Sequence, residues 1–466
     1  MKQHLLIATM TLALGLSNAL AQFTITRVVS TVTPVPGGSG PFDFMAYPGT
    51  DGMKVYFNGA DEAGHFGIFG GTGGALTTLA DWTMPIPGAS GLFEFINRPN
   101  ANLGRVGFAG GNATVSGLYL ASGGTIQRIA DTTVAVPGGG GLFASFNDLS
   151  VGSWGVVFRA NANLPTEGIY RYSATGLAAV VTFQTPVPGG GGSTFQYLAS
   201  PVAGSEDMTF FGNNLETGAD RRSGIYRATE SGTIQLMIGN TDIDPGSGTR
   251  YSAFGLQAVN PAGQMAVVAQ SAAGAFESVR FWTGDRWTTL AQAGTPVPGS
   301  PDAHFDSFHP SISLDEWGNV AFHADDDTGN TGIYLATGGQ LLKVVDLDTP
   351  IDEGKKPLDE HSLGLADNQM AGGMLAFYAV TGPGEFGIYV TSVSKPAPRL
   401  RITDAPETVS LFWPTNAIGF RLQRAATLPP TVAWDNVTNT PTTLGAEFQV
   451  QVGRSDGAGF YRLVNP

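Results

Sequence analysis

A six-residue stretch, Thr185-Pro186-Val187-Pro188-Gly189-Gly190, recurs along this chain at nearly constant spacing. Its second proline and the following glycine appear six times, at Pro36-Gly37, Pro87-Gly88, Pro137-Gly138, Pro188-Gly189, Pro245-Gly246 and Pro298-Gly299. Neighbouring copies are 51, 50, 51, 57 and 53 residues apart, and a degenerate copy at 349–353 follows 54 residues after the last. Such a period indicates a repeat architecture, in which each repeat is one supersecondary unit.

Each repeat holds four short segments rich in β-branched and aromatic residues, separated by Gly, Ser, Asn and Asp clusters, and this pattern predicts β-strands. The third segment is the most regular, with an odd copy at Val279-Arg280-Phe281. The regular copies are Gly67-Ile68-Phe69, Gly117-Leu118-Tyr119, Gly168-Ile169-Tyr170, Gly224-Ile225-Tyr226, Gly332-Ile333-Tyr334 and Gly387-Ile388-Tyr389. Four antiparallel strands, repeated seven times, predict an all-β fold with a seven-bladed β-propeller over residues 23–393.

The fourth segments predict how the ring closes. Only six follow a third segment within a repeat, because none follows the last one at 387–389. A matching segment lies instead at Ile25–Ser30, directly before the first proline turn. We therefore expect the N-terminal strand to complete the last blade and remove the exposed edge of an open array.

The N-terminus has the pattern of a secretory signal over residues 1–21. A basic start at Lys2 precedes an apolar run from Leu5 to Leu16 and the small-x-small site Ala19-Leu20-Ala21. No segment is long and apolar enough to predict a membrane span, and the chain contains no cysteine. We therefore expect a monomer that is secreted or periplasmic, or attached to the cell surface. A formal net charge of −14 makes nucleic acid an unsuitable partner.

Two second segments carry a resemblance. Residues 260–267 (NPAGQMAV) and 315–322 (DEWGNVAF) resemble the Asn-x-x-Gly-x-x-Ala-Phe repeat of a family of exported bacterial tandem-repeat proteins with varied C-terminal anchors. The resemblance covers residues from about 25 to 393, although other copies depart from it, such as Gly104–Phe108. It implies export and a propeller-like array, and it implies no reaction.

A proline-bearing linker at 394–398 separates the repeats from a tail at 399–466, where the period disappears. Alternating segments predict strands at Leu400–Thr403, Val409–Trp413, Gly419–Arg424, Phe448–Val452 and Phe460–Val464. Trp413-Pro414 and Phe460-Tyr461-Arg462-Leu463 resemble C-terminal modules of exported proteins in verrucomicrobia-like bacteria, which implies a small fibronectin-type β-sandwich used for display or adhesion. Trp413 and Trp434 could stack on sugars, but core packing is the simpler interpretation.

Motifs of catalysis are missing from the repeats: residues 23–393 contain no Gly-x-Ser-x-Gly, and the whole sequence contains no Gly-x-x-x-x-Gly-Lys and no His-Glu-x-x-His. His304, His309 and His323 lie near one another, but their spacing matches no zinc pattern. Carboxylates in the loops between second and third strands are the better candidates for a ligand-binding face. They are Asp61, Glu62, Glu216, Asp220, Asp325, Asp326 and Asp327. Asp325 and Asp327 could hold calcium, against the simpler alternative of a solvated acidic loop.

Two functions remain open from the sequence. The first is a non-enzymatic binding or scaffold protein that presents one propeller face to an extracellular ligand, such as a polysaccharide or a cell-surface component. The second is a carbohydrate-active enzyme, a lyase or a glycosidase, which rests on fold analogy alone. The proline turns are nearly invariant and the neighbouring loops vary in length and charge, an arrangement typical of binding surfaces, so binding is favoured.

Overall fold

The computed structural model describes residues 23–464 apart from gaps at 140, 163–166, 272–275, 366–369, 397, 399, 406, 415–419, 427–433, 445–446 and 454–458. The predicted signal at 1–21 lies outside the described residues. The described part of the chain is all-β, with no α-helix and one 3₁₀ turn, η1 (Gly218–Asp220). Accordingly, it contains no helix that could span a bilayer.

Residues 25–392 form seven antiparallel sheets, which we number blades 1 to 7 in chain order. Blades 1 to 4 are β2–β5 (Phe42–Thr50, Val55–Asp61, Phe66–Gly71, Thr77–Asp81), β6–β9 (Phe95–Asn102, Arg105–Gly111, Ser116–Ser122, Thr125–Asp131), β10–β13 (Ser145–Gly152, Gly155–Asn161, Gly168–Ser173, Gly176–Thr182) and β14–β17 (Tyr197–Ala203, Asp207–Asn213, Ser223–Thr229, Ile234–Gly239). Blades 5 and 6 are β18–β21 (Ala253–Val259, Met265–Gln270, Ser278–Trp282, Trp287–Gln292) and β22–β26 (Pro296–Val297, Ser300–Leu314, Val320–Asp326, Thr331–Thr337, Gln340–Asp346). Blade 7 combines β27–β30 (Leu363–Gly364, Met370–Ala371, Met374–Gly382, Glu385–Ser392) with β1 (Ile25–Ser30).

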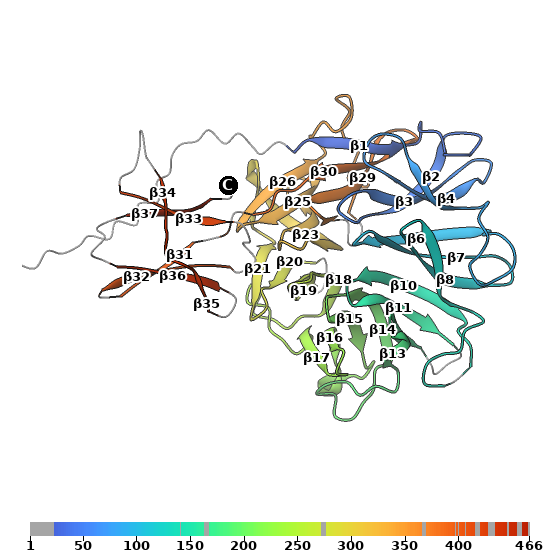
Figure 1. Cartoon of the computed structure of the whole chain (residues 1–466), viewed down its shortest axis with the longest axis horizontal. Helices are drawn as coiled ribbons and strands as arrows, with labels where there is room; N and C mark the ends of the chain where they lie inside the picture. Colours follow the sequence, from blue (N-terminus) through green and yellow to red (C-terminus); the bar gives the residue numbers. More distant parts are fainter. Residues whose placement is uncertain are drawn as a thin grey trace, which may run out of the picture.

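The blades are arranged around an axis, as the colour sequence in Figure 1 shows. Innermost strands of successive blades contact one another from β2 through β6, β10, β14 and β18 to β23. Contacts of β23 with β28, and of β2 with β29, complete the circle. This radial arrangement of antiparallel sheets is a β-propeller, which confirms the predicted fold class.

The N-terminal strand closes the ring, as the sequence predicted. β1 pairs antiparallel with β30, so that Ile25 lies opposite Thr391 and Ser30 opposite Gly387. Val28 and Val29 are buried in one apolar cluster with residues of blades 1 and 7. The last sheet therefore joins the two ends of the propeller, and β1 takes the outer position that a fourth strand takes in blades 1 to 5.

Three aromatic rings hold each regular blade together. One follows the proline turn, one lies on the second strand and one on the third, and all are at most 2% exposed in blade 4 (Phe195, Phe210 and Tyr226). In blades 1, 2, 3, 4 and 6 the first ring meets the third edge to face, with centroids 4.8 to 5.2 Å apart. Such pairs add about 0.5–1.5 kcal/mol each beyond the burial of their area. The repeated third-strand aromatic is therefore a core residue.

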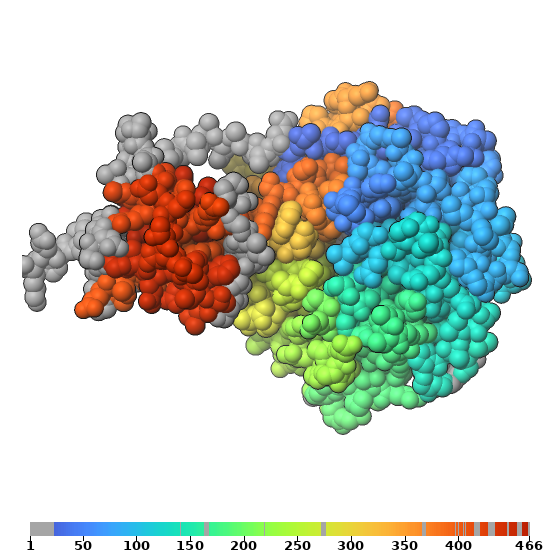
Figure 2. All heavy atoms as spheres, in the orientation of Figure 1, coloured from blue at the N-terminus to red at the C-terminus, as the bar shows by residue number. Residues whose placement is uncertain are grey.

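The C-terminal strands form two further sheets, which project to one side of the ring in Figure 2. The first sheet contains β31 (Arg401–Asp404), β32 (Thr408–Pro414), β36 (Glu447–Gly453) and β35 (Thr442–Leu444). The second contains β34 (Asp435–Asn436), β33 (Arg421–Ala425) and β37 (Phe460–Val464). One apolar cluster joins them and includes Trp413, which is 2% exposed and therefore packs in a core. Arg462 lies over the ring of Trp434 at 4.3 Å. A fibronectin-type module stays a prediction.

Closure by β1 can be tested with one buried valine. Val29→Asp places an unpaired carboxylate at a site that is 1% exposed. We expect it to lower the free energy of unfolding by about 3 kcal/mol or more, because the buried charge finds no partner and the apolar contacts are lost. Urea unfolding followed by tryptophan fluorescence measures the change. Val32→Asp, at a site that is 70% exposed, is the matched control and should leave stability unchanged. Equal stability of the two variants would contradict a closure that depends on β1.

Candidate functional site

The proline turns and the loops between second and third strands share one end of the ring, which we call the turn face. Asp61, at the end of β3, accepts hydrogen bonds from the backbone N–H of Ser39 in the preceding turn (2.9 Å). At the same repeat position in blades 2 and 4 the side chain donates instead: Asn112 Nδ2 donates to Ser90 O (3.1 Å), and Asn214 Nδ2 donates to Ser193 Oγ (2.9 Å). The sequence prediction that these loops share a face is confirmed.

One repeat position therefore supplies the residue that fixes the turn face. Asp61 also accepts from the N–H of His65 (2.9 Å) and lies 2.8 Å from His65 Nδ1. Burial alone would raise the pKa of the Asp61 carboxyl, but the hydrogen bonds from His65 and Ser39 outweigh it and hold that pKa far below its ordinary value. Asp326 is equivalent and accepts from the N–H groups of Thr328 (2.9 Å) and Asn330 (3.0 Å). Asp61 and Asp326 are 4% and 5% exposed, so both are structural loop caps.

The other predicted acids lie at the surface of the same face. Glu62 is exposed beside Asp61, and Glu216 and Asp220 are exposed in the blade 4 loop that contains η1. Asp325 and Asp327 are directed to different histidines: His309 Nε2 lies 3.1 Å from Asp325 Oδ1, and His304 Nδ1 lies 3.3 Å from Asp327 Oδ2. A calcium ion shared by Asp325 and Asp327 stays a prediction.

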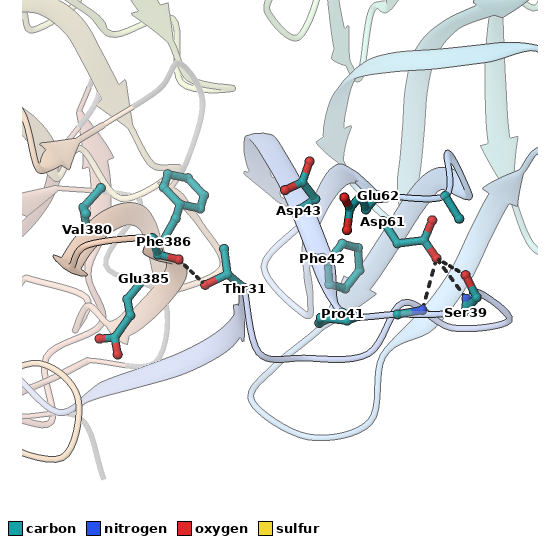
Figure 3. Close-up of a pocket in the computed structure, with 13 residues that line it drawn as sticks. Thr31, Ser39, Pro41, Phe42, Asp43, Asp61, Glu62, Val380, Glu385 and Phe386 are labelled. Atoms are coloured by element: carbon teal, nitrogen blue, oxygen red, sulfur yellow. Dashed lines mark hydrogen bonds between the residues drawn. The ribbon is translucent and has the colours of Figure 1, made fainter.

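A cleft of about 810 Å³ opens between blades 1 and 7 on this face (Figure 3). Asp43, Asp61 and Glu62 line it from blade 1, and Val380, Glu385 and Phe386 from blade 7. The segment after β1 connects the two sides, because Thr31 N–H donates to Phe386 O (3.0 Å) and Thr31 Oγ1 donates to Gly384 O (2.8 Å). The cleft therefore exists only when the ring is closed.

The cleft is acidic. Four carboxylates line it, and among the residues that the structure describes no Lys, Arg or His does. The Asp61 carboxylate already accepts hydrogen bonds from backbone N–H groups, and Glu385 is paired with Lys355, whose Nζ lies 2.6 Å from Glu385 Oε2. Asp43 and Glu62 are exposed, and within the described part of the chain they have no hydrogen-bond or ion-pair partner. These two carboxylates are consequently the acceptors that a ligand can reach.

Sequence reasoning missed a second hollow, of about 280 Å³, between the innermost strands of blades 1 to 5. Tyr47, Arg98, Asp148 and Ser200 line it, and all four have positive φ values, between 28° and 52°. Each lies at a register shift between the first and second strands of its blade. Pro48, Pro99 and Pro201 follow three of them. The sequence did contain a signal for these register shifts. Several repeats have a proline at the matching place in the first strand, and proline within a strand indicates a bulge.

Comparison with known proteins supplies a family and distant likenesses. A protein-family model described as "Family of unknown function (DUF7453)" matches residues 59–292. No curated protein matches. Among solved structures, the β-propeller domain of the Trilobed protease from Pyrococcus furiosus is 9% identical over 79% of this chain and 94% of that chain, with a TM-score of 0.41. A prolyl endopeptidase is 12% identical over 79% of this chain and 54% of that chain (TM-score 0.42). A lectin of Aleuria aurantia, solved in complex with Fucα1-6GlcNAc, is 11% identical over 66% and 97% (TM-score 0.33).

The capping role of Asp61 predicts a pH dependence. Its folded-state pKa is depressed, so the stability it contributes is present above the unfolded-state pKa and is lost as the pH falls through the folded-state value. We expect Asp61→Asn to lower Tm at pH 7 by roughly 3 °C or more, and the difference from the unmodified protein to shrink as the pH falls below about 3.9. Scanning calorimetry at pH 7 and pH 3 measures it. Asp302→Asn, at an exposed site, is the control. A difference that grows in acid would contradict the assignment.

Proposed function

The chain belongs to DUF7453, a family of unknown function, and from this premise we propose that it is a non-enzymatic binding protein whose turn face holds an extracellular glycan. The observation that carries the proposal is the pair of exposed, unpartnered carboxylates, Asp43 and Glu62, in the cleft between blades 1 and 7. Carboxylate oxygens accept hydrogen bonds from sugar hydroxyls, and such charge-assisted bonds are stronger than neutral ones.

The charge of the cleft limits the class of glycan. Because four carboxylates and no described Lys, Arg or His line it, the cleft repels uronates, sulfates and phosphates and admits neutral or amino sugars. Phe386 adds an apolar surface on the blade 7 side, where its ring lies 5.7 Å from that of Tyr378. A sugar ring presents hydroxyl groups, which the carboxylates can accept hydrogen bonds from, and C–H groups, which can pack on the apolar side chain.

The frame around the cleft favours binding because it is held in place before any ligand arrives. Asp61 fixes the blade 1 loop to its proline turn, and Thr31 fixes the N-terminal segment to blade 7. Binding then costs little conformational entropy on the protein side. Export and attachment to a surface through the C-terminal sheets belong to the same proposal, and the signal-like N-terminus and the resemblance of the tail support them.

A carbohydrate-active enzyme is the second candidate, favoured by the pair of Asp61 and His65. The carboxylate holds His65 Nδ1 at 2.8 Å, which leaves Nε2 as the other ring nitrogen for proton transfer. The imidazole packs on Trp82, with ring centroids 4.7 Å apart. An oriented histidine beside an acidic cleft is an arrangement that a lyase or a glycosidase could use.

Glycan-array binding by the purified protein, followed by calorimetry with the best neutral glycan, tests the first candidate. We expect the double variant Asp43→Asn, Glu62→Gln to lose about tenfold or more in affinity, because each lost charge-assisted hydrogen bond is worth about 1.5–3 kcal/mol. Asp302→Asn combined with Glu206→Gln makes the same change of charge at exposed sites outside the cleft and should bind normally.

Unchanged binding by the cleft variant would contradict the proposed site. A reducing-sugar assay with the same glycans separates the second candidate. If the unmodified protein releases reducing sugar and His65→Gln does not, the function is catalysis and not binding alone.

A further inference from the structure

We infer that blade 6 contains a binding site for a transition-metal ion of the zinc type, formed by His309, His323 and Asp325. His309 comes from β23, and the other two residues come from β24, two positions apart. One potential ligand atom from each residue lies within 4.8 Å of the others. This goes beyond glycan binding, because the cleft lies between blades 1 and 7 and contains none of these residues.

The three side chains run from the core of blade 6 to its surface. His323 is 4% exposed, whereas the side chains of His309 and Asp325 are 37% and 36% exposed. Imidazole nitrogen and carboxylate oxygen are both ligands of first-row transition-metal ions.

Neighbouring hydroxyls orient the donors, as second-shell groups do in metal sites. His323 Nε2 lies 2.8 Å from Thr331 Oγ1, and the ring is 4% exposed. Ser307 Oγ donates to Asp325 Oδ2 at 3.1 Å, while Asp325 Oδ1 lies 3.1 Å from His309 Nε2. His323 and Asp325 therefore form a supported pair on one strand, and His309 approaches it from the neighbouring strand.

The two imidazoles are stacked, with centroids 3.7 Å apart and planes inclined by 8°. Nitrogen lone pairs lie in the ring plane, so two parallel rings cannot both direct a lone pair at one ion. His309 must therefore turn and exchange its hydrogen bond to Asp325 for the metal. The His309 side chain is 37% exposed, so this rotation moves no core residue.

The donor set selects the class of ion. Two imidazoles and one carboxylate suit zinc and its first-row neighbours, whereas calcium takes oxygen ligands. Three protein ligands leave a fourth position of a tetrahedral ion open to water. Asp325 and His309 are both about one-third exposed, so the ion and its water are reached from solvent.

The test is calorimetric titration of zinc chloride into the full chain prepared without a polyhistidine tag. We expect one ion per chain with a dissociation constant of about 10 μM or lower, and His309→Gln to weaken binding by roughly tenfold or more. His361→Gln removes a histidine whose side chain is 87% exposed and should leave the affinity unchanged. Circular dichroism of the metal-free variants checks that all are folded.

Cobalt supplies a readout that does not depend on a variant. Cobalt bound to the unmodified protein should show the visible absorption of a four- or five-coordinate ion, lost on addition of zinc. The inference is overturned if zinc does not bind at about 1 mM, or if His309→Gln binds it as tightly as the unmodified protein. Calcium binding that survives His309→Gln and is lost in Asp327→Asn would overturn it too, in favour of an ion on Asp325 and Asp327.

Discussion

The ring depends on one pairing, that of β1 with β30. Without β1, the outer edge of β30 would lose its partner, and the apolar cluster that Val28 and Val29 share with Ile388 and Val390 would open to water. The same segment joins the two sides of the cleft through Thr31. Closure of the fold and formation of the candidate site are thus consequences of the same contacts, so a binding site between the first and last blades reports on the integrity of the whole ring.

Blade 5 shows that a blade of this propeller can keep its four strands when charged residues replace two apolar core residues. In blade 5, Arg280 stands where the other third strands carry Tyr or Phe, and Asp244 stands where their turns carry Val or Ile. The Arg280 guanidinium, 3% exposed, lies 3.9 Å from Asp244 Oδ1, and the Tyr251 hydroxyl donates to the same oxygen at 3.3 Å. A buried charge is tolerated there because its partner is buried with it. Apolar packing has been exchanged for a charge pair within one blade, and the four strands remain.

Much of this fold follows from the sequence because it depends on a repeated pattern. The strand content, the turn face and the place of β1 were all predictable from spacing and from counting third and fourth segments. The details of the site were not. A bulge at Arg98 or Asp148 shifts the register by a residue, and the period of a strand does not reveal it. The sequence also could not distinguish Asp61, a buried cap, from its exposed neighbour Glu62. The stacking of His309 on His323 was not predictable either, because the two residues lie on different strands.

Hydrogen exchange measured by mass spectrometry tests the central claim most directly, because it reports the opening of each strand in the unmodified protein. If β1 closes the ring, the amides of Thr26–Ser30 exchange as slowly as those of β29 in the same sheet, and both become labile together as urea is added. If β1 is a frayed terminus, its amides exchange within seconds while those of β29 stay protected. That second result would contradict the account of closure and of the cleft formed by it.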